Sequence, residues 1–294
     1  MKKILSIALL ICVTLQVQAQ LLWKVSGNGL NQPSYIMGTH HLSPLSIKDS
    51  IAGMKQALAD TKQVYGELVM SEMQNPANMQ LMQKEMVTAT DTTFQSLFTP
   101  EEYEMINKYS KENLMFDITT MPKIKPAFLS NNLILIIYLK HVGGFNPQEQ
   151  LDTYFQTQAT ASGKKVGGLE KIEFQFNLLF NNASLQRQAQ LLLCMLNNLD
   201  KGIKQMKQLT ADYNAQDIDA MYKLSTEIEG NQCDPLPGEN EAMLDNRNKN
   251  WAEKLPAILH EAPTFVAVGA LHLAGENGLL NLLKEKGYTI EPVK

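Results

Sequence analysis

The stretch Thr264–Leu280, TFVAVGALHLAGENGLL, decides how the chain is expected to fold. It opens with a continuous apolar run, Phe265 to Val268, which is typical of a strand buried on both faces of a parallel sheet. Gly269 ends the run, and His272 follows shortly after it. Because ligands bind at the carboxyl ends of strands in open α/β sheets, His272 is expected at a binding edge.

A second stretch repeats this order near the start of the chain. Ser34–Leu42 reads SYIMGTHHL, in which a short apolar strand stops at Gly38 and His41 follows. One Gly-x-x-His motif carries no information by itself. Two of them, each after a strand pattern and each followed by leucine, predict two strand ends that converge.

Segments rich in β-branched and aromatic residues recur at both ends of the chain and predict six strands. They are Leu21–Ser26, Ser34–Met37, Gln63–Leu68, Lys165–Leu169, Phe265–Val268 and Tyr288–Ile290. Helical patterns fill the segments between them, at about 75–163 and 171–260. The sequence therefore predicts an α/β protein (α+β mixed), with a central mixed sheet from the N- and C-terminal segments and a large helical insertion. We expect residues 20–294 to form a single domain.

Three patterns predict where helices begin. Asn75-Pro76 and the capping box at Thr99 each place a capping side chain before a proline, and Asn146-Pro147 has the same form. Amphipathic helices are expected over Asn181–Leu199 and Ala215–Glu229, and a further helix is expected over Glu241–His260.

The first nineteen residues have the pattern of a signal peptide. Lys2 and Lys3 precede the apolar run Ile4–Val13, and a small-residue cleavage site ends at Ala19. The sequence therefore predicts an exported protein, periplasmic or secreted after cleavage near Ala19. The apolar run is too short to span a membrane, and no segment of the mature chain is long enough.

Composition and cysteine content limit the possible functions further. The chain of 294 residues has a net charge of −4, which argues against nucleic acid as a partner because phosphate binding needs a basic patch.

Two cysteines, Cys194 and Cys233, lie beyond the predicted signal peptide. They either pair as a disulfide in an oxidising compartment or remain as a buried thiol and a loop thiol.

Four ionisable residues fall at predicted strand ends: His41, Glu67, Glu170 and His272. Imidazole and carboxylate groups together suit a divalent transition metal, such as Mn²⁺, Co²⁺ or Zn²⁺. Two histidines and one carboxylate leave coordination positions open, as a catalytic site requires. We therefore take His41, Glu67 and His272 as candidate metal ligands.

Glu67, Glu170 and Arg247 are the candidate catalytic residues. Glu170 is interpreted as a general base or as a partner of a ligand, and Arg247 as a group that holds a substrate carboxylate or a developing oxyanion. The alternatives are structural. A strand-end histidine is commonly hydrogen-bonded, the glutamates can cap the helices that follow, and Arg247 can pair with Asp245 or Glu241 on its own helix.

A methionine-rich stretch follows the third predicted strand. Methionine is flexible and polarisable, so the stretch is interpreted as adaptable core or as the lining of a cleft. Its members are Met70, Met73, Met79, Met82 and Met86.

Several ordered segments together resemble the TraB/GumN family, which is related to the TIKI metalloproteases and similar to the erythromycin-esterase/ChaN-like fold group. The resemblance covers essentially the whole mature chain. The segments are WKVSGNGLNQPSYIMGTHHL, VYGEL, LDTYFQTQATASGKKVGGLE, RNKNWAEKL and FVAVGALHLAGENGLLNLLKEKGYTI. The one departure is Tyr65-Gly66 before Glu67, where an apolar run is expected.

The resemblance implies divalent-metal-dependent proteolysis by the matching residues, which are His41, Glu67, Arg247 and His272, with Glu170 from the Gly-Leu-Glu segment. The first hypothesis is therefore an exported metal-dependent hydrolase, a peptidase, acting on a peptide or small-molecule substrate. The alternative is a non-catalytic periplasmic binding protein that uses the same cleft for a small ligand, a peptide or a metal cofactor. A third possibility is a degenerate member with a structural role.

Overall fold

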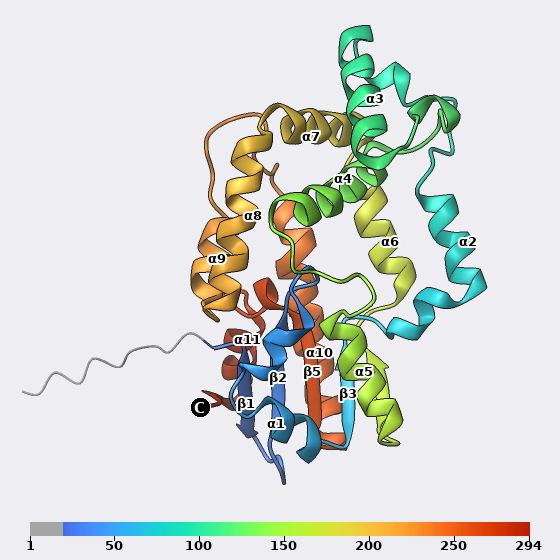
Figure 1. Cartoon of the computed structure of the whole chain (residues 1–294). Coiled ribbons are helices and arrows are strands. Elements are labelled where there is room, and N and C mark those ends of the chain that lie inside the picture. Colours follow the sequence, from blue (N-terminus) through green and yellow to red (C-terminus); the bar gives the residue numbers. More distant parts are fainter. Residues whose placement is uncertain (1–19) are drawn as a thin grey trace, which may run out of the picture.

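The computed structural model describes residues 20–294, and the predicted signal peptide lies outside the described residues (Figure 1). Within the described part, six strands form one sheet in the order β4-β3-β5-β2-β1-β6. The strands are β1 (Leu22–Gly27), β2 (Ser34–Thr39), β3 (Gln63–Gly66), β4 (Lys165–Gly168), β5 (Thr264–Gly269) and β6 (Tyr288–Pro292). Each lies where the sequence predicts a strand, and the mixed α/β class is confirmed.

The sheet is parallel through its middle. Strand β5 lies between β2 and β3 and is parallel to both, and β4 is parallel to β3. Strand β1 pairs antiparallel with β2 and with β6 at the other edge. The carboxyl ends of β2, β3, β4 and β5 therefore meet along one side of the sheet, where ligand sites of α/β proteins form.

Helices cover both faces of the sheet (Figure 1). One face carries α1 (Met54–Asp60) and α5 (Leu151–Ala161), and the other carries α10 (Asn246–Glu261) and α11 (Leu279–Glu285). The apolar run of β5 is buried because both faces are covered, and Phe265 packs against Phe155 of α5 with ring centroids 4.9 Å apart. Trp251 and Leu255 of α10 are fully buried in the same core.

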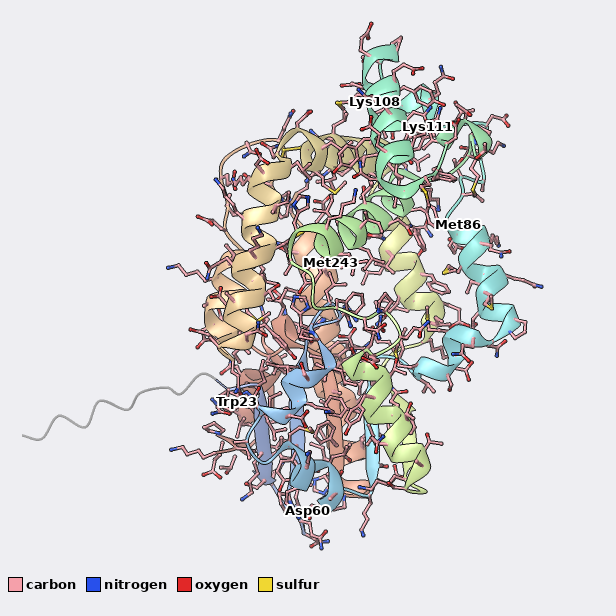
Figure 2. All side chains as sticks on the ribbon, viewed as in Figure 1. Trp23, Asp60, Met86, Lys108, Lys111 and Met243 are labelled. Carbon is pink, nitrogen blue, oxygen red and sulfur yellow. A yellow bond between two sulfur atoms is a disulfide. The ribbon has the colours of Figure 1, made fainter. Side chains whose placement is uncertain are left out.

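The remaining helices lie beyond the side of the sheet where the parallel strands end (Figure 1). They are α2 (Pro76–Glu85), α3 (Pro100–Leu114), α4 (Pro126–His141), α6 (Ile172–Asn181), α7 (Leu185–Asn197), α8 (Leu199–Asn214) and α9 (Ile218–Ser225). A second core that includes Ile106, Leu133 and Leu192 holds α3, α4 and α7 together. Side chains project from all of these helices into the spaces between the ribbons (Figure 2).

Short helical turns connect the longer elements. They are η1 (Leu45–Asp49), η2 (Met70–Gln74), η3 (Gln95–Leu97), η4 (Ile118–Thr120), the π-helical turn η5 (Glu241–Asp245) and η6 (Ala270–His272). Turn η5 runs directly into α10, so the helix predicted from Glu241 begins with a widened turn.

The predicted helix starts are confirmed in two cases out of three. Asn75 caps α2, and Thr99 forms the capping box of α3 with Glu102. The start predicted at Asn146 is wrong, because Asn146 accepts a hydrogen bond from Gln148 N in a turn and α5 begins only at Leu151.

The single helix predicted over Asn181–Leu199 is also wrong. Helix α6 ends at Asn181, and the next helix starts after Ser184, whose side chain accepts a hydrogen bond from Arg187 N. A capping serine competes with the helix interior for backbone hydrogen bonds, so it divides the segment in two.

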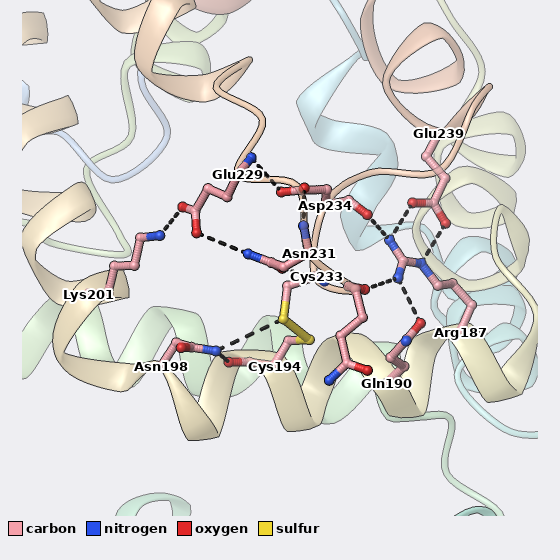
Figure 3. Close-up of a disulfide and its surroundings, with 11 residues drawn as sticks. Arg187, Gln190, Cys194, Asn198, Lys201, Glu229, Asn231, Cys233, Asp234 and Glu239 are labelled. Atoms are coloured by element: carbon pink, nitrogen blue, oxygen red, sulfur yellow. Dashed lines mark hydrogen bonds and ion pairs between the residues drawn. A yellow bond between two sulfur atoms is a disulfide. The ribbon is translucent and has the colours of Figure 1, made fainter.

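Cys194 of α7 and Cys233 form a disulfide with Cα atoms 5.7 Å apart, which settles the two alternatives left by the sequence (Figure 3). The loop that carries Cys233 joins α9 to η5. Arg187 fixes this loop as well, because it donates to both carboxylate oxygens of Glu239 at 3.0 Å and to the carbonyls of Gln232 and Asp234. The loop that precedes α10 is thereby anchored to α7.

Candidate functional site

The parallel strands place the four predicted strand-end residues along one side of the sheet. Glu67 follows β3 directly, Glu170 follows β4, and His41 follows β2. His272 lies in η6, immediately after β5. Arg247 enters from the first turn of α10 and contacts three of the four.

Arg247 is the centre of a buried network. Its Nε donates to Glu170 Oε1 at 3.0 Å, and its Nη2 donates to Glu67 Oε2 at 2.6 Å and to Glu170 Oε2 at 2.9 Å. Its Nη1 donates to His272 Nε2 at 3.1 Å and to the Met243 carbonyl at 3.2 Å. These contacts engage all five N–H groups of the guanidinium, so Arg247 acts as a cross-link in this arrangement.

Glu170 is the most enclosed member of the network, with a side chain 2% exposed. Besides the Arg247 contacts, it accepts from Trp251 Nε1 at 2.9 Å and from Gln175 Nε2 at 3.1 Å. Both carboxylate oxygens are therefore occupied by donors. These contacts favour the interpretation of Glu170 as a partner that positions Arg247 over its interpretation as a general base.

Glu67 links the network to β5. Its Oε1 accepts from the Gly269 amide at 2.9 Å, and its Oε2 accepts from Gln175 Nε2 at 3.1 Å in addition to Arg247. Burial acts to raise the pKa of Glu67, but His272, Arg247 and His41 together with the Gly269 amide outweigh it and lower the pKa to about 2. Glu67 is therefore a carboxylate at neutral pH.

The departure at Tyr65-Gly66 has a steric explanation. A Cβ atom at Gly66 would lie 2.5 Å from Gln156 Nε2. That amide donates to the Leu68 carbonyl at 2.7 Å, while Gln156 Oε1 accepts from Met70 N at 2.8 Å. Glycine at the end of β3 therefore leaves room for the glutamine that fixes the segment carrying Glu67.

His272 is buried and neutral. Because arginine only donates, His272 Nε2 must accept from Arg247, and Nδ1 therefore carries the proton that it donates to Asn248 Oδ1 at 2.7 Å. The Asn248 amide is oriented by its own bond to the Asn277 carbonyl at 2.9 Å. Burial lowers the pKa of His272 to about 4, and the charges of Arg247 and His41 act in the same direction.

His41 lies apart from the Arg247 network and has a different partner. Its Nδ1 is 3.0 Å from Asp152 Oδ2, and its side chain is 63% exposed. Asp152 is buried on α5 and also accepts from Thr39 Oγ1 at 2.9 Å. The Asp152 charge raises the pKa of His41 to about 9, with their hydrogen bond as the next cause.

Asp152 and Gln175 contact the candidate site residues but are absent from the sequence prediction. For Asp152 the sequence offers only a local signal, an acidic residue in the first turn of α5, which does not indicate a contact with His41. For Gln175 no pattern in the sequence points to the site. His40, in contrast, is packed against Tyr213 with ring centroids 5.3 Å apart, and burial lowers its pKa to about 4.

Two neighbouring cavities meet at His41 and Glu67, which line both. The larger has a volume of about 420 Å³ and also contains His272 and Arg247 in its lining. The smaller has a volume of about 160 Å³ and extends toward Met70 and the helix α6. His41 therefore reaches the predicted site across a shared cavity rather than by direct contact.

The donor chemistry of these residues suits a divalent metal. Both histidines have Nδ1 held by an oxygen atom, of Asp152 and of Asn248, which leaves Nε2 as the nitrogen that could bind a metal. Among residues 20–294 no group of three or more His, Cys, Asp or Glu side chains is gathered as a metal site. At His272 Nε2 and Glu67 Oε2, a metal would replace bonds that Arg247 makes in this structure.

The fold and the site together define a mixed α/β protein with a buried polar network at the carboxyl ends of its parallel strands. The chain matches the TraB/PrgY/gumN family over residues 21–292 and belongs to that family, as the sequence predicts. In the described part of the chain no helix is long and apolar enough to cross a membrane.

Two curated relatives are metalloproteases of Danio rerio. Metalloprotease TIKI1 is 22% identical over 320 residues, and metalloprotease TIKI2 is 21% identical over 314 residues. Each alignment covers 92% of this chain but only 62% and 60% of the respective relative, so the chain spans about three fifths of their length. No solved structure matches.

Proposed function

We propose that the chain is a metal-dependent hydrolase, and specifically a peptidase. The reaction takes place where the two cavities meet, at His41 and Glu67 beside the Arg247 network. The observation that carries this proposal is the convergence of His41, Glu67 and His272 on one pair of cavities, from three parallel strands. The similarity to two proteins named as metalloproteases supports it.

In this proposal His41, Glu67 and His272 hold the divalent metal, which is Mn²⁺, Co²⁺ or Zn²⁺. When bound, such an ion polarises a substrate carbonyl and lowers the pKa of a bound water. Asp152 and Asn248 orient the two imidazoles, because each holds one Nδ1 atom.

The roles proposed for Arg247 and Glu170 follow from their contacts. Glu170 holds the guanidinium at Nε and Nη2, and Arg247 in turn holds Glu67 and His272. Arg247 also lines the larger cavity, and its Nη1 group would be without the His272 acceptor if His272 Nε2 held a metal. There it can donate to a substrate carboxylate or a developing oxyanion.

Export to the periplasm or the medium is part of the proposal. It rests on the signal-peptide pattern of residues 1–19 and is supported by the Cys194–Cys233 disulfide, since disulfides persist in oxidising compartments. The substrate is then an extracytoplasmic peptide or a small molecule, and the net charge of −4 disfavours nucleic acid.

Metal content tests the proposal directly. The mature protein is purified without chelator, exchanged against manganese, cobalt or zinc, and compared with His41→Ala and His272→Ala. The matched control is His141→Ala, because His141 is exposed at the end of α4. We expect near-stoichiometric metal in the wild type and the control and its loss in the two site variants. Metal binding that survives both site substitutions would overturn the ligand assignment.

Peptide cleavage tests the reaction. We expect metal-dependent cleavage of peptides from a mixed library by the wild type, and its loss in Glu67→Gln with folding intact. The second candidate function is a binding protein, favoured by the full engagement of the Arg247 and Glu170 donors and acceptors. Ligand binding at the two cavities without turnover of any library peptide would support that alternative.

A further inference from the structure

The smaller cavity has an apolar wall and a polar end. Its polar end contains His41, Glu67, Asp152, Gln156 and Gln175. Its wall is formed by Leu68, Met70, Met73, Phe176 and Leu179. Leu179 is 42% exposed and Met73 is 36% exposed, so the wall continues onto the surface as an open apolar rim. Apolar walls with a few convergent polar groups are typical of ligand sites.

The methionine-rich stretch serves two purposes in this region. Met82 and Met86 pack against the cluster of Ile172, Phe176 and Phe180 and hold α2 on α6. Met70 and Met73, on η2, line the cavity instead. Both interpretations made from the sequence, core and cleft lining, therefore apply to different members of the stretch.

One side of the cavity wall, the segment from Leu68 to Met70, is held in place by a side chain of α5. Gln156 of α5 forms paired hydrogen bonds with the Leu68 carbonyl and the Met70 amide, at 2.7 and 2.8 Å. On the opposite side, Phe176 is buried within α6. The cavity thus has fixed walls at its inner end, while its rim at Met73 and Leu179 is made of flexible side chains.

We infer that this cavity receives one large apolar side chain of the substrate peptide, of the leucine, methionine or phenylalanine class. The inference rests on the proposed function, because the cavity shares Glu67 and His41 with the larger one. A cavity of about 150 Å³ accommodates a group the size of benzene, so about 160 Å³ fits one such side chain. The Glu67 carboxylate at the polar end disfavours an acidic side chain.

Cleavage kinetics test this inference with peptides that differ at one position only. We expect kcat/KM to be higher by about tenfold or more for leucine, methionine or phenylalanine than for glycine or aspartate at the position beside the cleaved bond. Leu179→Asp should reduce that preference by a similar factor while metal content is unchanged. Leu179→Ala is a milder variant that keeps the measurement available if Leu179→Asp folds poorly.

Met79→Asp is the matched control. Met79 lies on the neighbouring α2, is 47% exposed and is not part of the cavity lining. We expect it to keep the wild-type preference. Equal kcat/KM for all the peptides, or the same loss of preference in Met79→Asp, would overturn the inference.

A binding experiment separates failure of the pocket from failure of the peptidase. Binding of N-acetyl-phenylalanine amide and of N-acetyl-glycine amide is followed by ligand-observed NMR in the wild type, Leu179→Ala and Met79→Asp. Selective binding of the phenylalanine probe, weakened only by Leu179→Ala, supports the pocket even if no peptide is cleaved, in which case the peptidase alone fails. Binding that does not discriminate between the probes, or that Leu179→Ala leaves unchanged, overturns the pocket.

Discussion

At the scale of single residues, the positive charge of Arg247 compensates the two carboxylates that are buried beside it, those of Glu67 and Glu170. Two glutamates, each no more than 12% exposed, share one guanidinium, and His272 stays neutral beside it. Buried charges are tolerated only when they are paired and hydrogen-bonded, so removing the cation exposes the full desolvation cost of both carboxylates. The network is therefore expected to affect the stability of the fold as well as the proposed site.

Replacing Arg247 is expected to be strongly destabilising. Arg247→Ala should lower the free energy of unfolding by about 3–5 kcal/mol, because it leaves the carboxylates of Glu67 and Glu170 buried without their cationic partner. Urea denaturation measures the change. Lys249→Ala, on the exposed side of the same helix, should stay within about 0.5 kcal/mol of the wild type. An Arg247→Ala protein as stable as this control would contradict the prediction.

The pair His41–Asp152 gives a prediction about pH. The pKa of His41 is raised from 6.5 to about 9, so the pair stabilises the fold fully below about pH 6.5 and loses this contribution as the pH rises through about 9. In Asp152→Asn the negative charge is gone, and the pKa of His41 should fall toward its ordinary value. NMR titration of the His41 ring protons measures it. A His41 pKa that remains near 9 in Asp152→Asn would show that another group is responsible.

At the scale of elements, the strands were predictable and some helix limits were not. A strand such as β5 carries its own signal, a continuous apolar run that ends at a glycine. The start of α5 was misplaced because Asn146-Pro147 has the form of a capped helix but forms a turn. Gln175 and Asp152 come from helices whose packing depends on contacts distant in sequence, and no local pattern records which helix face meets the site.

The Cys194–Cys233 disulfide, which ties the loop before α10 to α7, is expected to stabilise the fold. The bond joins cysteines 39 residues apart, and a loop of that size corresponds to a stabilisation of about 3–4 kcal/mol in the chain-entropy description. The double variant Cys194→Ser/Cys233→Ser should therefore unfold at a lower denaturant concentration than the oxidised mature protein.

Thiol titration of the denatured, unreduced mature protein provides the control, and it should find no reactive thiol. Because Arg187 still binds Glu239 and two loop carbonyls, the variant should keep its native far-UV circular dichroism spectrum. Equal denaturation midpoints for the oxidised protein and the variant would contradict a stabilising role for the bond.

At the scale of the whole molecule, the chain runs back and forth between the two largest hydrophobic cores of the described residues. One core lies around the sheet and includes Val266, and the other lies among α3, α4 and α7 and includes Ile106. The sequence assigns helices α5 and α10 to the helical insertion, but both pack on the sheet. The chain therefore passes from the core around the sheet to the other core and back again.

We therefore expect one cooperative unfolding transition. Ile106→Ala and Val266→Ala should each lower the midpoint of that single transition, because each leaves a cavity in a core where the residue is fully buried. Calorimetry of both variants measures it. Two separate transitions, with each substitution shifting only one of them, would mean that the chain consists of two independent domains.

The position of β5 has a consequence for the order of events during synthesis. This strand lies between β3 and β2 in the sheet but follows both of them by about 200 residues in the chain. Until residue 269 has left the ribosome, β2 and β3 have no neighbour between them, and Glu67 lacks the Gly269 amide that binds it. Pairings between such distant segments form slowly. The arrangement of Glu67, Arg247 and His272 described above therefore forms only after β5 has been synthesised.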